Sequence, residues 1–116
     1  QFNENAKIHA FSHTFSEMNH NEIEGYESKL GNFIPIFLED DKDNERIIKR
    51  MKIIKGLVKK KGYECIEVKS KGKSLLEKLC YAMYLGDLTS YYLAKEYGVD
   101  PVKVDLIENL KKELAK

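Results

Sequence analysis

Apolar residues recur at helical spacing in three stretches of the chain. The first stripe lies between residues 45 and 61, the second between 75 and 96, and the third between 104 and 114. A period of 3.6 residues predicts a helix in each stretch. The second helix carries apolar residues around much of its circumference, which indicates that another domain or subunit covers it.

Capping residues mark the ends of the predicted helices. Asp43 or Asn44 is expected to cap the first helix, and Gly62 to end it. Ser74 is expected to cap the second helix, which should stop near Gly98. A glycine just past a helix is the residue best suited to the left-handed turn that closes it.

Two shorter stretches have the character of strands. Residues 33–38 form a continuous apolar run, in which Pro35 indicates an edge position or a bulge, and residues 63–68 alternate. A strand, a helix and a second strand predict a right-handed βαβ unit with parallel strands. Residues 1–15 are expected to be loop, with a short strand through residues 8–11.

The stretch from residue 16 to residue 26 is polar, with a narrow apolar side. It is predicted to begin a helix that is capped by Ser16, loosens at Gly25 and continues to about Leu30. Within it, His20 stands between Asn19 and an asparagine at position 21. A titratable imidazole held by amide hydrogen bonds is typical of a functional site rather than of an ordinary surface helix.

Composition excludes several classes of protein. The chain has 116 residues, 42% of them hydrophobic, and a net charge of +1, which predicts one globular domain and no nucleic-acid or acidic-membrane partner. No apolar run has the length of a membrane span and no signal peptide is recognisable, so we expect a cytoplasmic protein. The first residue is Gln1 rather than Met, which indicates a fragment or a trimmed product. Cys65 and Cys80 match no metal-ligand spacing and are expected to be buried free thiols.

Three motifs carry a resemblance to a known family. They are the sequence Asn-His-Asn-Glu-Ile at residues 19–23, Asn-Glu-Asn-Ala-Lys at residues 3–7, and Leu-Gly-Asp-Leu-Thr-Ser-Tyr-Tyr-Leu-Ala at residues 85–94. Together they resemble the C-terminal part of the bifunctional phosphoglucose/phosphomannose isomerases, which belong to the sugar isomerase (SIS) superfamily. The similarity runs over essentially the whole chain but covers less than half of a family member, because such enzymes carry two SIS domains.

This resemblance implies a fold and an activity. The fold would be α/β, a three-layer αβα domain of the SIS, flavodoxin-like type with a short, mostly parallel sheet. Residues 1–116 would be the C-terminal SIS domain of a two-domain protein, with the domain's first elements and the N-terminal SIS domain missing. The activity would be the interconversion of glucose 6-phosphate, and of mannose 6-phosphate, with fructose 6-phosphate through an enediolate, in a homodimer and without a cofactor or metal.

The resemblance also assigns roles to individual residues. Glu4 would be the base that moves the proton between C1 and C2, and His20 would open the sugar ring, acting across the dimer interface. Lys111, with Lys112 as the alternative, would contact the sugar and assist ring opening, and Asn19 would bind substrate. The arginine that stabilises the enediolate and most of the phosphate-binding groups would belong to the absent part, so the chain alone is expected to be inactive.

Several alternatives remain open. The domain could act on another sugar phosphate, or it could bind a phosphosugar for regulation without chemistry. His9, His13 and Glu17 stand four residues apart and would form a metal site if they shared one helix. Residues 93–104 fit the spacing of a DNA-binding helix-turn-helix, but the following helix is acidic on its outer side, so a simple packing corner is favoured. The basic side of residues 46–61 is interpreted as a solvated helix face rather than a polyanion site.

Overall fold

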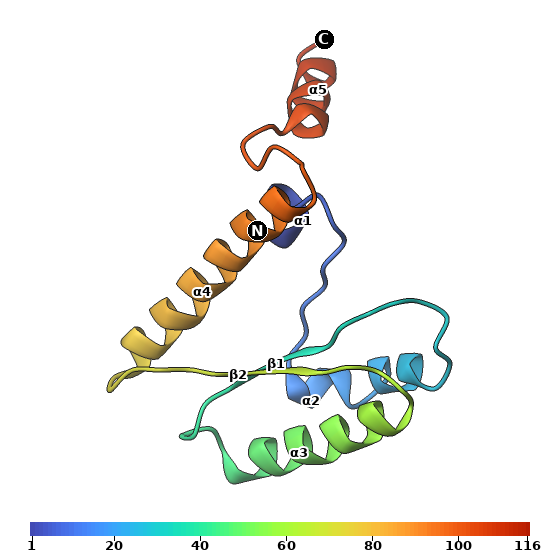
Figure 1. Cartoon of the computed structure of the whole chain (residues 1–116), viewed down its shortest axis with the longest axis vertical. Coiled ribbons are helices and arrows are strands. Elements are labelled where there is room, and N and C mark those ends of the chain that lie inside the picture. The colour runs from blue at the N-terminus through green and yellow to red at the C-terminus, as the bar shows by residue number, and fades with distance from the viewer. The chain divides into compact units, whose positions relative to one another are not determined.

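The computed structural model describes all 116 residues, which form six helices and two strands. In chain order these are α1 (Phe2–Asn5), α2 (Phe15–Met18), the 3₁₀ helix η1 (Glu22–Tyr26), β1 (Ile36–Glu39), α3 (Glu45–Lys60), β2 (Ile66–Lys69), α4 (Leu75–Glu96) and α5 (Asp105–Leu114) (Figure 1). The chain divides into two compact units, one formed by residues 12–82 and the other by residues 1–11 with 83–116. None of the helices combines the length and the hydrophobicity that crossing a bilayer requires.

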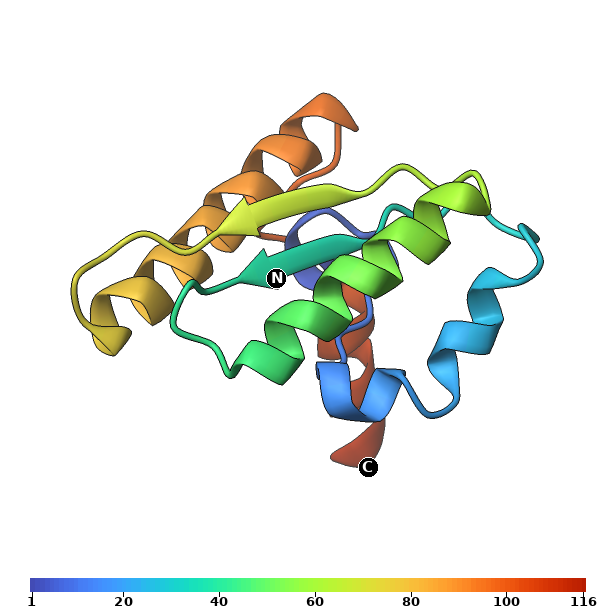
Figure 2. The ribbon, with the colours of Figure 1, turned by 90° about the horizontal axis from the view of Figure 1, so that it is seen from below.

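The unit of residues 12–82 is built on two parallel strands. β1 pairs with β2 in a register that sets Ile36 opposite Ile66 and Glu39 opposite Lys69. The connection between the strands is α3, which runs alongside them (Figure 2). This strand–helix–strand arrangement confirms the predicted α/β class with its short parallel sheet.

Local sequence explains where α3 begins and ends. The side-chain oxygen of Asn44 accepts a hydrogen bond from the backbone N–H of Arg46 at 2.9 Å, which satisfies a donor in the first turn. Gly62 follows the helix with φ at +85°, a conformation that costs a glycine little and other residues more. Both ends therefore form as the sequence predicts.

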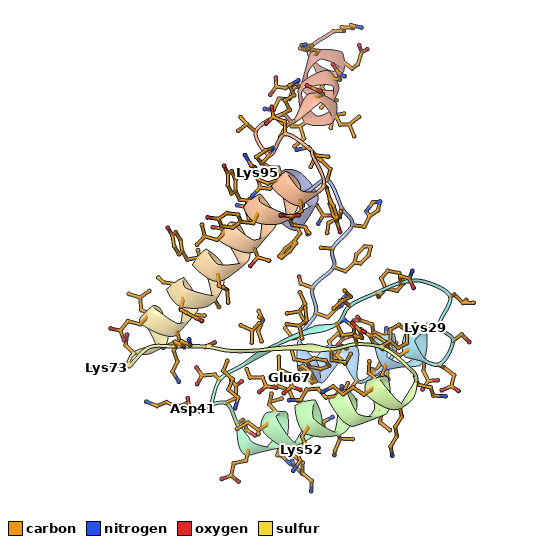
Figure 3. All side chains as sticks on the ribbon, in the orientation of Figure 1. Lys29, Asp41, Lys52, Glu67, Lys73 and Lys95 are labelled. Atoms are coloured by element: carbon orange, nitrogen blue, oxygen red, sulfur yellow. The ribbon has the colours of Figure 1, made fainter.

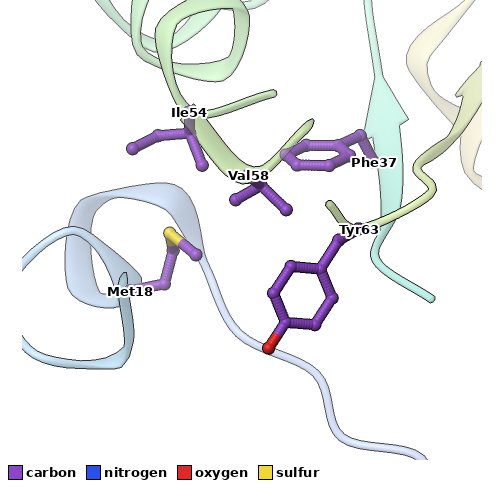
Figure 4. Close-up of a cluster of buried hydrophobic side chains, with 5 residues drawn as sticks. All are labelled: Met18, Phe37, Ile54, Val58 and Tyr63. Carbon is purple, nitrogen blue, oxygen red and sulfur yellow. The ribbon is translucent and has the colours of Figure 1, made fainter. Parts of the chain in front are cut away.

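One apolar cluster holds this unit together. Its buried members are Met18, Phe37, Ile54, Val58 and Tyr63, shown in Figure 4. They come from α2, β1, α3 and the segment before β2, so burial in one place joins all of these segments. Aromatic side chains from η1 and α2 pack around the cluster, where the ring of Phe15 lies 5.7 Å from that of Phe37.

The strand side chains alternate between the cluster and the opposite face. Phe37 is 5% exposed, whereas its neighbours Ile36 and Leu38 are 48% and 56% exposed. Ile66, which faces Ile36 across the ladder, is also exposed. A side-chain period of two places these three residues on one face, so the unit of residues 12–82 does not bury this apolar face.

The unit of residues 1–11 and 83–116 is organised by small residues. Ala6, Ser90 and Ala94 are its buried positions, and the last two lie four residues apart on α4. Ser90 also receives a hydrogen bond from Asn5 of α1. Small side chains let two helices approach closely, so these residues bring α1 against α4.

α5 forms where the sequence predicts a helix, but it does not make the expected packing corner. Its apolar residues Leu106, Ile107, Leu110 and Leu114 are all exposed. The loop between α4 and α5 begins at Gly98, which has φ at +66° and ends α4 as predicted. The period of the apolar residues thus predicted the helix correctly but not its contacts.

The N-terminal third differs most from the prediction. Residues 8–11 form no strand, and the helix predicted from residue 16 to about residue 30 is broken into α2 and η1. The break falls at Asn19–Asn21, where the N–H of His20 bonds to the carbonyl of Glu17 three residues back instead of continuing an α-helix. Asparagine and histidine are weak helix formers, because the Asn side chain competes for backbone hydrogen bonds.

The structure also differs from the prediction in a helix cap, in the starts of the strands and in the burial of a cysteine. Thr14 rather than Ser16 precedes the first turn of α2, and it makes no side-chain capping bond. β1 and β2 each begin about three residues later than predicted. Cys80 is exposed rather than buried, whereas Cys65 is partly buried and its burial raises the pKa of the thiol.

The cluster generates a prediction that two adjacent isoleucines of α3 can test. Ile54→Ala should lower the free energy of unfolding by about 2–5 kcal/mol, because it removes buried methyl groups and leaves a cavity. Ile53→Ala is the matched control, since Ile53 is 51% exposed and its loss should change stability by about 0.5 kcal/mol or less. Urea denaturation followed by circular dichroism measures both, and equal losses would contradict the assignment of the core.

Candidate functional site

Glu4 lies on the short helix α1, where its carboxylate is exposed and takes part in no hydrogen bond or ion pair. The side chain of Asn3 donates to the carbonyl of Ala10 at 2.9 Å and accepts from the N–H of Ala10 at 3.0 Å. The ammonium of Lys7 donates to the carbonyl of Glu4 itself. The backbone around Glu4 is thus fixed while its carboxylate remains available.

His20 and Asn19 lie together just after α2. Asn19 accepts a hydrogen bond from the guanidinium of Arg50 at 3.2 Å, and its amide nitrogen lies 3.1 Å from the sulfur of Met18. Asn19 therefore ties the end of α2 to α3. The ring of His20 is exposed and makes no hydrogen bond, so the neighbouring amides do not hold the imidazole as the sequence led us to expect.

The two candidate lysines lie on α5. Lys111 pairs with Glu108 at 3.3 Å, one turn earlier on the same helix, and both side chains are exposed. Lys112 is also exposed and has no partner. Exposed pairs of this kind contribute little to stability, so Lys111 can leave Glu108 for a ligand at small cost.

The predicted site residues fall into two groups. Glu4 and Lys111 belong to the unit that contains α1 and α5, and no hydrogen bond or ion pair joins them. Asn19 and His20 belong to the unit that contains α2 and α3. Neither unit alone brings the base and the imidazole together, so their roles stay predictions.

The alternative metal site depends on a helix that does not form. Residues 9–13 form no helix, and Glu17 lies in the separate helix α2, so His9, His13 and Glu17 share no helix face. His13 instead lies 3.1 Å from a carboxylate oxygen of Glu22. No group of three His, Cys, Asp or Glu side chains is arranged to hold a metal ion.

Sequence reasoning missed a cavity at the carboxyl ends of the two strands. Its volume is about 570 Å³, and Figure 3 shows Asp41 and Lys73 at this end of the sheet. The most buried charged residue there is Lys78 of α4, which is 6% exposed and bonds to the carboxylates of Asp40 and Asp41. The carboxyl ends of parallel strands are where ligands usually bind in open α/β sheets.

Two lysines that line this cavity, Lys78 and Lys55, pair with carboxylates in it and beside it. The hydrogen bond from Lys78, followed by that from the backbone N–H of Lys42, lowers the pKa of Asp40 to about 2. Glu67 of β2 is similar, because hydrogen bonds from Lys55 and Lys59 lower the pKa of its carboxyl to about 2. Carboxyls held this strongly as anions are poor general bases, so we assign the network to fixing α3 and residues 75–82 against the strands rather than to chemistry.

Comparison with known families supports the sequence motifs. The family model described as the bacterial phospho-glucose isomerase C-terminal SIS domain matches residues 1–114. A bifunctional phosphoglucose/phosphomannose isomerase of Thermoplasma volcanium is 43% identical over 99% of the chain, which covers 37% of that protein. The protein of the same description from Aquifex aeolicus is 39% identical over the whole chain and 37% of its own length.

The chain thus spans little more than a third of the length of these relatives. A shorter match of 46 residues, 39% of the chain and 15% of the relative, is 54% identical to a D-glucosamine-6-phosphate 4-epimerase of Sulfolobus acidocaldarius. No solved structure gives a significant match.

The pairing of Asp40 with Lys78 predicts a dependence of stability on pH. Because the folded-state pKa of Asp40 is about 2, below its ordinary value of 3.8, the pair stabilises the fold above about pH 4 and loses that contribution as the pH falls through 2. The stability difference between the wild type and Asp40→Asn, measured by urea denaturation, should therefore shrink over this range. In a Lys78→Met background the same difference should be small at every pH, and an unchanged pH dependence there would contradict the assignment.

Proposed function

The chain belongs to the family of C-terminal SIS domains of bacterial phosphoglucose isomerases, and we propose that it supplies the proton-transfer base of an aldose–ketose isomerase. The substrates would be glucose 6-phosphate and mannose 6-phosphate, each interconverted with fructose 6-phosphate. The observation that carries this proposal is the match of the family model to residues 1–114, which include all four candidate site residues. In this proposal residues 1–116 form the C-terminal SIS domain of a larger enzyme.

The chemistry begins with the proton on C2 of the open-chain sugar. A base removes it, the resulting enediolate is reprotonated at C1, and the aldose has become a ketose. Glucose 6-phosphate and mannose 6-phosphate differ only in configuration at C2, so both give enediolates of the same composition. Glu4 suits the role of the base, because its carboxylate has no partner in the chain and its backbone is anchored on both sides.

Ring opening requires a group that exchanges protons near neutral pH. Histidine is the side chain type that changes charge between pH 5 and 8, and His20 presents an exposed ring without a competing hydrogen bond. In this proposal His20 acts at the ring oxygen, with Asn19 beside it at the sugar. Lys111 contributes a positive charge at the sugar once it leaves Glu108.

The rest of the site is assigned outside this chain. The unit that contains Glu4 has no arginine, because its permanently charged cationic side chains are all lysines. We propose that an N-terminal SIS domain supplies the arginine that stabilises the enediolate and the groups that bind the phosphate. We further propose a homodimer in which His20 of one subunit reaches the sugar held by the other.

A second candidate function follows from the shorter match. The Sulfolobus acidocaldarius relative carries the name of an epimerase that acts on an amino sugar phosphate. Its similarity is confined to 39% of the chain, whereas the isomerases match nearly all of it, so we favour the isomerase. A non-catalytic phosphosugar sensor is the remaining alternative, and it would show binding without turnover.

Activity can be measured in a chimera that joins this chain to the remaining N-terminal part of the Thermoplasma volcanium relative. The chain alone should show no turnover of glucose 6-phosphate, and the chimera should show it, because the proposed site needs groups from both parts. A coupled assay that detects fructose 6-phosphate measures both proteins. Turnover by the chain alone would contradict the proposed division of the site, and glucosamine 6-phosphate tested in parallel distinguishes the second candidate function.

Replacing the proposed base tests the mechanism. Glu4→Gln in the chimera should lower kcat by about 10²–10⁴-fold while the affinity for glucose 6-phosphate is retained, because the amide keeps the shape of the side chain and cannot accept the C2 proton. Glu64→Gln is the matched control, since Glu64 is exposed and makes no hydrogen bond. A Glu4→Gln chimera with unchanged kcat would exclude Glu4 as the base.

A further inference from the structure

We infer that Asn5 and Ser90 are positioning residues for Glu4, which hold its short helix against α4 through one directed hydrogen bond. The side-chain amide of Asn5 donates to the hydroxyl oxygen of Ser90 at 2.8 Å, across 85 residues of sequence. This inference rests on the proposed role of Glu4 as the base. It adds two residues that would not touch the substrate themselves.

The hydrogen bond has a fixed direction because the hydroxyl proton of Ser90 is already used. Ser90 donates to the carbonyl of Asp87 at 2.7 Å within α4, which leaves its oxygen free to accept. Ser90 is fully buried, so no water can replace Asn5 as the donor without a rearrangement. Removing either partner would leave the other without this bond.

Packing around the hydrogen bond leaves little room for α1 to move. Ala6, next to Asn5, is 1% exposed, and Ala94, one turn beyond Ser90 on α4, is fully buried. α1 contains four residues, far fewer than a helix needs to be stable by itself. Its geometry therefore depends on these tertiary contacts.

The backbone on the other side of Glu4 is also fixed. Lys7 adopts a left-handed conformation with φ at 58°, which is uncommon for a residue other than glycine. Asn3 bonds both backbone groups of Ala10. Both neighbours of Glu4, Asn3 and Asn5, thus use their side chains to anchor the backbone, whereas the side chain of Glu4 alone is unbound.

This arrangement suits a base that must meet one hydrogen of a bound sugar. Catalytic rates are sensitive to placement, and an error of about 1 Å can cost roughly 10²-fold. Loosening α1 should therefore slow proton transfer. Binding should change little, since the sugar phosphate is held mainly by other groups in the proposed site.

The test uses Asn5→Ala and Ser90→Ala in the chimera described above. Each should lower kcat about 10–100-fold with KM changed by about twofold or less, and the double variant should be no slower than the slower single variant. Thr89→Ala is the matched control, because the hydroxyl of Thr89 bonds to the carbonyl of Leu85 inside α4 and not to α1. Thr89→Ala should keep the parental kcat and KM.

The outcomes separate this inference from the function on which it rests. If Glu4→Gln abolishes turnover while Asn5→Ala leaves kcat unchanged, the positioning role is wrong and the base assignment stands. If Glu4→Gln is fully active, both fail. A rise in KM at constant kcat, or losses that simply add in the double variant, would also overturn the positioning role. If Ser90→Ala fails to fold, Asn5→Ala decides the question, since Asn5 is only partly buried and alanine is a good helix former.

Discussion

The contact between α3 and the inner face of the two strands is the interaction on which the unit of residues 12–82 depends. Phe37 of β1 packs in one buried cluster with Ile54 and Val58 of α3. Met18 joins the same cluster from α2, so the segment that carries Asn19 and His20 is ordered by apolar burial one residue away. The polar stretch could not form a stable structure by itself, because its own residues favour turns over helix.

The unit of residues 1–11 and 83–116 orders its short helix α1 without a large apolar cluster. It has few large buried side chains, and α1 is held instead by small residues and by side-chain amides that bond to the backbone and to Ser90. Polar anchoring of this kind is directional, whereas apolar burial is not. A carboxylate that acts as a base must be held in one orientation toward the substrate. The directed hydrogen bonds around Glu4 therefore support its proposed role more strongly than its exposure alone would.

Elements with local signals were predictable, and elements held by distant contacts were not. Single residues mark where two helices begin, at Asn44 and Ser74, and where they end, at Gly62 and Gly98. The hydroxyl of Ser74 accepts a hydrogen bond from the N–H of Glu77, as a capping residue does. The parallel pair followed from the order of strand, helix and strand. By contrast, α1 has only four residues, too few to show a helical period. The residue that anchors it, Ser90, lies 85 residues from Asn5 in the sequence.

The candidate site divides in the same way. Family motifs made Glu4 and His20 the candidates, but no sequence pattern could show that the ring of His20 lacks an amide partner, since Asn19 bonds to Arg50, 31 residues away. The burial of Lys78 could not be predicted from the sequence either, because its partners Asp40 and Asp41 come close to it only when the chain folds. Long-range pairing of polar groups is the information that a single sequence does not display.

The central claim is that Glu4 and His20 act on the same sugar. The most direct measurement is a crystal structure of the chimera with a non-reacting analogue of the open-chain hexose phosphate bound. We expect the carboxylate of Glu4 to lie within about 3 Å of the C1–C2 edge of the analogue, and an imidazole from His20 to lie within hydrogen-bonding reach of the C5 oxygen. A structure that places these two groups in separate clefts, with no sugar able to contact both, would contradict it.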